Sequence, residues 1–226
     1  ISPNTWYGSS NRIGMFDTQN GLFFEYDGQT LFAVWRQSIN QINGTSTVTN
    51  GSATVTGTGT TFSSQLKPGD YIVIRGQSYR VQNITSDTSM LITPEYRGAT
   101  LSATGAGVLI SKTVDTRIPQ SQWLDPLDGT GPSGYTLDLT RMQMFYIDYS
   151  WYGAGFIRWG MRTGKGQVTY VYQQTNNNLQ YEAYMRSGNM CSRYESNGTA
   201  PSTFLTASLG TGSAGTVISV ASTAGF

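Results

Sequence analysis

Hydrophobic and polar residues alternate with a period of two along most of this chain, which is the pattern of β-strands with one covered face. An apolar run at 13–16 precedes two strands that we predict at 22–26 and 30–35, separated by a turn at Asp27 and Gly28. Both of these strands are apolar on both alternating faces, so we expect both of their sides to be covered. A sandwich core or a subunit interface would provide that cover.

The middle of the chain has a different character. From 45 to 110 the sequence is rich in Thr, Ser, Gly and short aliphatic residues, and aromatic residues become rare. A turn at 67–70 leads into a compact apolar run at 71–74, and further short alternating runs follow between turn residues. Short strands at this spacing predict a small β-barrel.

Aromatic-rich sequence resumes beyond this middle segment, which indicates that one domain is interrupted by another. We predict an all-β protein with essentially no helix, in which a jelly-roll-like β-sandwich is formed by 1–44 and 111–208. The small β-barrel at 45–110 would be inserted into it. The Gly-, Ser- and Thr-rich residues at 209–226 are expected to be a linker or the start of a further β-module, so that the sequence continues beyond Phe226 in a longer chain.

Composition and charge exclude several classes of function. The chain has 14 Lys and Arg residues against 13 Asp and Glu, a net charge of +1, so no broad field favours nucleic acid as a partner. No apolar stretch of about 18 residues is present, and we expect no membrane partner. With no histidine and one cysteine, Cys191, the chain lacks the commonest zinc ligand and general base, and it has no internal disulfide framework.

No catalytic chemistry is supported by the remaining polar residues. The carboxylate pairs Asp125 with Asp128 and Glu182 with Glu195 could be nominated for glycoside hydrolysis. However, aspartate in a loop of Pro and Gly is usually a turn former, and Cys191 has no imidazole partner. We therefore predict a protein that is not an enzyme, with no catalytic, cofactor-binding or metal-binding residues and no cofactor.

The abundant aromatic residues are the strongest functional candidates. Core packing is the favoured interpretation, followed by a subunit interface and then by sugar recognition. The residues that we nominate for an interface are Phe23, Tyr26, Phe32, Trp35, Trp123, Leu127, Trp151, Tyr152 and Trp159.

Two stretches of sequence carry a resemblance to a known family. These are RIGMFDTQNGLFFEYDGQTLFAVW at 12–35, and 123–159, which contains LDGTGPSG and most of IDYSWYGAGFIRWG. Together they resemble structural proteins of tailed-bacteriophage virions, especially those of aquatic phages. The middle segment, with TVTGTGTTF and LKPGDYIVIRG, resembles a small β-module of phage tail and fibre proteins, and TVISVASTAGF at 216–226 resembles the opening of another.

The resemblance implies a virion component that is tail- or fibre-associated and works by self-assembly and by docking to other virion proteins. Its expected partners are copies of itself and other virion proteins, with a host surface glycan as a further candidate. The alternatives are a head decoration or head-fibre protein, which differs only in location, and a carbohydrate- or receptor-binding module. A depolymerase ranks last, because it would need a close, exposed carboxylate pair.

Overall fold

The computed structural model describes residues 9–101, 107–150, 152–164, 166–180, 183–186 and 190–198. These residues are nearly all β, as predicted, and their helical parts are the one-turn helix α1 (Phe62–Gln65) and the 3-10 turn η1 (Gln120–Gln122). The strands are β1 (Ser9–Phe16), β2 (Gly21–Tyr26), β3 (Leu31–Gln41), β4 (Thr45–Val48), β5 (Thr54–Thr58), β6 (Tyr71–Ile74), β7 (Gln77–Ser86), β8 (Ser89–Thr93), β9 (Ile110–Pro119), β10 (Phe145–Tyr149), β11 (Phe156–Arg162), β12 (Val168–Thr175) and β13 (Ser192–Gly198).

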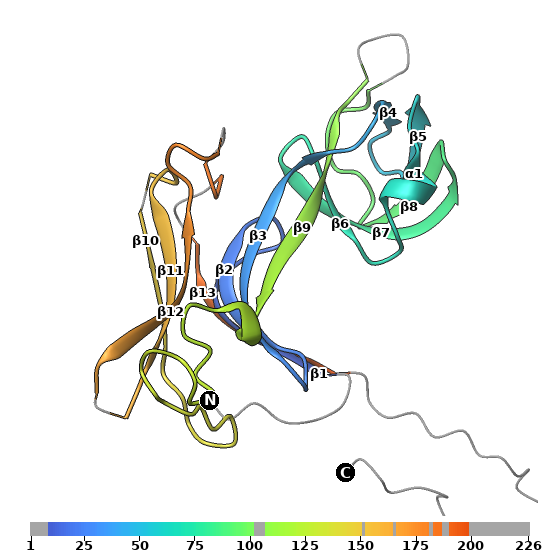
Figure 1. Ribbon diagram of the computed structural model, residues 1–226. Coiled ribbons are helices and arrows are strands. Elements are labelled where there is room, and N and C mark those ends of the chain that lie inside the picture. Colours follow the sequence, from blue (N-terminus) through green and yellow to red (C-terminus); the bar gives the residue numbers. More distant parts are fainter. Residues whose placement is uncertain are drawn as a thin grey trace, which may run out of the picture.

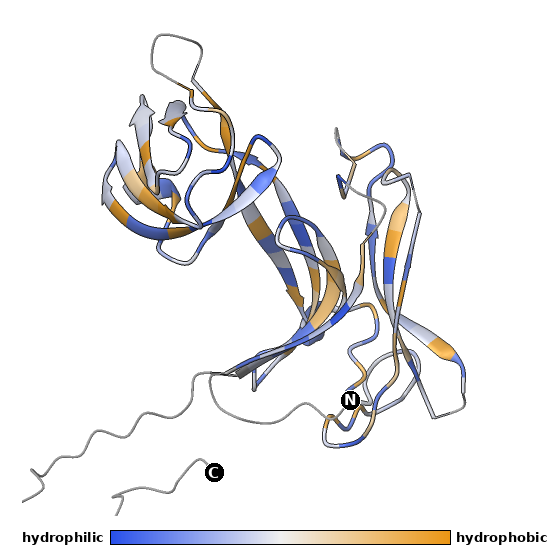
Figure 2. Ribbon diagram, turned by 180° about the vertical axis from the view of Figure 1, so that it is seen from behind, coloured by the Kyte–Doolittle hydropathy of each residue, from blue (hydrophilic) through white to orange (hydrophobic). Residues whose placement is uncertain are grey.

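The first of two β units is a sandwich. Antiparallel strands in the order β13-β1-β2-β3-β9 form one layer, and β10-β11-β12 form a second sheet that faces it (Figure 1). Leu22, Phe24 and Trp35 on the inner face of the first layer pack against Ile157 and Trp159 of the second. Outside β2, hydrophobic residues (orange) and hydrophilic residues (blue) follow one another along several of these strands (Figure 2), as expected for strands with one covered face.

Every residue of β2 is buried, so the prediction that both of its sides are covered is confirmed. The inner face meets the second sheet. On the outer face, Phe23 packs against Phe16 and Val34, and the Arg36 guanidinium lies 5.2 Å from the centre of the Phe23 ring. Glu25 is buried beside it, where Arg12 and Arg117 approach its carboxylate. Charged side chains rather than a third layer therefore cover this outer face.

The second unit holds a separate core. Strands in the order β9-β6-β7-β8-β5-β4 curve around a cluster whose residues all lie in 42–110, including Phe62, Ile72, Tyr79 and Met90. The prediction of a small barrel at 45–110 is wrong in one respect. The strands form an open sheet that does not close on itself. A closed barrel needs consecutive paired residues where the ends meet, and the described residues supply only the isolated bridges Ser46–Val108 and Val48–Leu101.

The two units share one continuous ten-stranded sheet, since β3 and β9 run from one unit into the other. The β3–β9 pairing shifts register between Gln37 and Asn40, which marks a bulge where the strands pass between the units. A second contact joins the β1–β2 turn to the β6–β7 hairpin. There, Thr18 Oγ1 donates to Ser78 Oγ at 2.9 Å, and Gln19 Nε2 donates to the Gly76 carbonyl at 2.9 Å.

No helix among the described residues is long and apolar enough to cross a membrane.

Candidate functional site

The structure buries most of the residues nominated for an interface inside the chain itself. The buried ones are Phe23, Tyr26, Trp35, Trp123, Leu127 and Trp159. They lie between the two sheets of the sandwich, or under the arginines of its outer face in the case of Phe23, so they have intramolecular packing partners. These six side chains were nominated for an interface, but they pack within the chain and offer little exposed surface to a second copy.

Hydrogen bonds support the assignment of the tryptophans to the core. The indole N–H of Trp35 donates to the Tyr184 carbonyl at 2.8 Å, and that of Trp159 donates to the Phe23 carbonyl at 3.2 Å. Trp123 donates to the Ile118 carbonyl at 3.0 Å. Buried indoles normally find such partners, and here each partner is supplied by the same chain.

The other three nominated residues are placed differently. Phe32 is half-buried, with the Arg117 guanidinium 3.9 Å from its ring centre. Tyr152 is 84% exposed, and Trp151 lies outside the described residues. An interface role remains a prediction for these positions.

The aspartates considered as catalytic candidates form turns. Asp125 is buried and accepts hydrogen bonds from the backbone N–H groups of Leu127 at 3.1 Å and Ser133 at 2.9 Å. Asp128 accepts from the side chain and backbone of Thr130, and these hydrogen bonds lower the pKa of its carboxyl group. Among the residues that the structure describes, no group of three or more His, Cys, Asp or Glu side chains could hold a metal ion.

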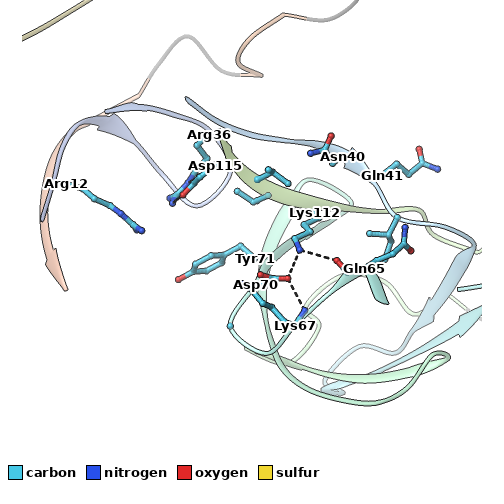
Figure 3. A pocket seen from close by; sticks show the side chains of 14 residues that line it. Arg12, Arg36, Asn40, Gln41, Gln65, Lys67, Asp70, Tyr71, Lys112 and Asp115 are labelled. Carbon is cyan, nitrogen blue, oxygen red and sulfur yellow. Dashed lines mark hydrogen bonds and ion pairs between the residues drawn. The ribbon is translucent and has the colours of Figure 1, made fainter. Parts of the chain in front are cut away.

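A polar cleft of about 700 Å³ lies between the two β units (Figure 3). One wall is the outer face of the sandwich, the other is the 65–71 segment of the second unit, and the floor is the region where β3 and β9 pass between them. The lining residues are Arg12, Arg36, Asn40, Gln41, Ile42, Gln65, Lys67, Gly69, Asp70, Tyr71, Lys112, Thr113, Val114 and Asp115.

Both carboxylates in the cleft are engaged by bases. Asp115 receives a bidentate contact from Arg36, with Nε at 2.7 Å and Nη2 at 2.8 Å. Burial alone would lower the pKa of Arg36, but the hydrogen bonds and charge of Asp115 outweigh burial and raise it. Asp70 accepts from Lys112 Nζ at 2.8 Å and from the Lys67 backbone N–H at 2.9 Å, while Lys112 also donates to the Gln65 carbonyl at 3.0 Å.

The remaining charge of the cleft is positive. Its lining has four bases, Arg12, Arg36, Lys67 and Lys112, against the two carboxylates just described. The Lys67 ammonium forms no ion pair within the described part of the chain, and the Arg12 contacts with Glu25 and Glu195 are both long, at 3.5 Å. Tyr71, which is 37% exposed, lies beside these groups (Figure 3). The arrangement can receive an anionic ligand with a face suited to stacking.

Sequence reasoning did not find this cleft. Its residues come from β1, β3, β9 and the 65–71 segment, which are separated along the chain and meet only through long-range strand pairing. The segment LKPGDY at 66–71 reads locally as a turn before a strand, and it is one. No local signal distinguishes Lys67 and Tyr71 from ordinary turn and strand residues.

No protein-family model and no curated protein matches this chain. Among solved structures, it is similar to a phage phi92 endosialidase with 14% sequence identity and a TM-score of 0.25. That match covers 86% of this chain and 31% of the endosialidase chain. This chain therefore spans about a third of the length of that structure.

Proposed function

We propose that this chain is a structural component of a tailed-phage virion, associated with the tail or a fibre, that acts by self-assembly and by docking to other virion proteins. The observation that carries the proposal is the continuous ten-stranded sheet, in which β3 and β9 join two β units that have separate cores. Such a joint resists bending, because changing the angle between the units would disrupt ladder hydrogen bonds as well as the contact between Thr18 in the β1–β2 turn and Ser78 in β7.

The resemblance of 12–35 and 123–159 to tailed-phage virion proteins supports the same role. A particle component has to transmit force and keep a fixed spacing between its neighbours, and strands that pass through both units suit that task. A head decoration or head-fibre protein is the same proposal with a different position in the particle.

Contact with a second copy of the chain is proposed at β10, which is an edge strand of the three-stranded sheet. Met142 and Met144 lie just before this strand and are 87% and 52% exposed. A groove of about 440 Å³, lined largely by Ile13, Met15, Phe145 and Ile147 together with Tyr194, runs between β10 and the strands β1 and β13. Exposed apolar side chains beside an unpaired strand edge are typical of a surface that pairs with another chain.

Two measurements test this proposal. Sedimentation of the purified chain should show association that depends on protein concentration, and the double variant Met142→Asp and Met144→Asp should shift it towards monomer. The matched control is Leu109→Asp, which changes a side chain of equal exposure to Met144, 52%, in the other β unit, and should leave association unchanged.

A cryo-EM reconstruction of the particle that carries the chain would then locate it. Density in the tail or a fibre, with contacts between copies at β10, is the expected result. A chain that stays monomeric at every concentration and occupies only an outermost tip of the particle would overturn the assembly role.

A further inference from the structure

We propose that the cleft between the two β units is a binding site for an acidic sugar, that is, a carboxylate-bearing unit of a glycan chain. The volume of about 700 Å³ falls within the roughly 300–1,000 Å³ of small-molecule sites, and the cleft lies between two folded units, where such sites are common. This binding goes beyond the assembly role, because a single copy of the chain contains the whole cleft.

Charge is the first reason for this ligand. The carboxylates of Asp70 and Asp115 are paired with Lys112 and Arg36, so their negative charges are neutralised by bases that the cleft itself supplies. Lys67 is the basic residue left without an ion pair among the described residues that line the cleft. An incoming carboxylate would pair with its ammonium group without displacing an existing contact, and a neutral ligand would leave that charge unused.

The second reason is the position of Tyr71. This residue is the first of β6 and follows the turn that carries Lys67, so the ring and the ammonium group belong to one short segment on the same wall. Tyr71 is 37% exposed and is among the side chains that line the cleft (Figure 3). A tyrosine ring offers a flat apolar face with a hydroxyl at its edge, which matches the apolar face and polar rim of a pyranose ring.

The end of β3, at the floor of the cleft, supplies neutral polar groups. Asn40 and Gln41 are exposed at the end of β3, and both line the cleft. Side-chain amides donate and accept hydrogen bonds, as the hydroxyl groups of a sugar also do. A bare phosphate or a carboxylate ion alone would use the bases but not these amides or the tyrosine.

The cleft is also held in shape before any ligand arrives. Its two walls are joined by the strands β3 and β9 at the floor and by the contact between Thr18 in the β1–β2 turn and Ser78 in β7. Lys112 links the floor to the second wall through Asp70 and the Gln65 carbonyl. A site that needs little reorganisation loses less affinity to the ordering of its side chains.

The experiment measures binding of three polysaccharide fragments to the purified full chain by calorimetry at low and moderate salt. The probes are oligogalacturonate, which carries carboxylates, sulfated dextran, which carries sulfates, and dextran, which is neutral. The variants are Lys67→Gln and Tyr71→Thr. Their controls are Arg141→Gln, an 81%-exposed base in the sandwich unit, and Tyr170→Thr, whose 39% exposure matches that of Tyr71.

The expected result is binding of oligogalacturonate that weakens as salt rises, about tenfold weaker or more in Lys67→Gln and in Tyr71→Thr, and unchanged in both controls. Dextran should not bind. Three results would overturn the proposal: no binding of oligogalacturonate by the folded chain, equal binding of sulfated dextran or dextran, or binding that neither cleft variant weakens. Association between copies is measured separately, so a chain that assembles without binding the sugar contradicts only this inference.

Discussion

At the scale of single residues, the buried tryptophans stabilise the sandwich, and Trp159 is the clearest case. It is 0% exposed, packs against the ring of Tyr172 and donates to the Phe23 carbonyl at 3.2 Å across the two layers. Replacing it with alanine would leave a large cavity and remove the hydrogen bond between the layers, so we expect Trp159→Ala to lower the free energy of unfolding by about 3–5 kcal/mol. Urea denaturation followed by circular dichroism measures this change.

The control for this variant is Tyr152→Ala, which removes an aromatic ring that is 84% exposed. A change of less than about 0.5 kcal/mol is expected there, because an exposed ring loses little packing. Similar losses in the two variants would mean that Trp159 does not lie in the core.

Ionisation of the Tyr184 side chain should make the stability of the folded chain depend on pH in the alkaline range. Its side chain is buried, and burial, followed by the nearby charges of Tyr149 and Asp148, raises the pKa of its phenol from 10.0 to about 12. The neutral form is therefore favoured in the folded chain, and this stabilisation is complete below about pH 10. As pH rises from about 10 to about 12, the phenol of the unfolded chain ionises first, and on the order of 2–3 kcal/mol is lost.

The variant Tyr184→Phe separates this effect from other alkaline changes. Phenylalanine cannot ionise, so the wild-type advantage in urea midpoint over the variant at pH 8 should shrink by pH 11.5. At neutral pH the variant is expected to be less stable, because the tyrosine hydroxyl donates to the Ser150 carbonyl. A difference between the two proteins that stays constant across this range would show that Tyr184 titrates normally.

At the scale of elements, cross-strand charge pairs stabilise the outer face of the sandwich. Arg36 on β3 and Asp115 on β9 are directly opposite and form a bidentate pair, with Arg36 only 7% exposed. Asp115→Ala would leave the guanidinium buried without its partner, and we expect a loss of about 2–3 kcal/mol in unfolding free energy.

An exposed pair provides the comparison for Asp115→Ala. Arg141 and Asp138 are 3.4 Å apart with side chains 81% and 52% exposed, so Arg141→Ala should change stability by less than about 0.5 kcal/mol. The comparison is made by urea denaturation at low and high salt. Equal effects would indicate that the Arg36 pair is screened by water as fully as a surface pair.

Elements with local signals were predictable from sequence, and elements that depend on distant pairing were not. The β2–β3 hairpin was predicted from the Asp27–Gly28 turn, and it forms with the Asp27 carboxylate accepting from the backbone N–H of Thr30 at 2.8 Å. In contrast, β13 pairs with β1 from the other end of the chain, and nothing local indicates that partner. Closure of the sheet in the second unit also depends on pairing between distant residues, and the described residues there form isolated bridges such as Ser46–Val108.

The cleft could not be predicted from the sequence either, because its residues are also brought together by pairing between distant strands. The rings of the sandwich core stand out in sequence as apolar runs, whereas Lys67 and Tyr71 become part of a site only when β6 pairs with β9 and β9 with β3. Aromatic content led to an interface hypothesis for residues such as Trp35 and Trp159, because a strand that is apolar on both faces has the same pattern in a core and in an interface.

At the scale of the whole molecule, the two units have separate cores, and this predicts what happens when the second unit is deleted. No described residue of 42–110 belongs to the sandwich core, and Gln41 on β3 lies opposite Ser111 on β9. Replacing 42–110 with Asn-Gly would join these two residues through a two-residue hairpin turn that suits antiparallel strands. We expect the shortened chain to fold as a sandwich, because its own core is complete, and to lose the second wall of the cleft.

The measurements that check this are circular dichroism, amide hydrogen exchange and sugar binding on the shortened chain. Protection should persist for β2, β3 and β11, where core strands remain paired, and should fall at 111–112, where β9 loses β6 as a neighbour. Oligogalacturonate binding should be lost, since Lys67 and Tyr71 are removed. Collapse of the sandwich on deletion would instead show that the second unit stabilises the first through the shared sheet and the Thr18–Ser78 contact, so that the two cores form one cooperative unit.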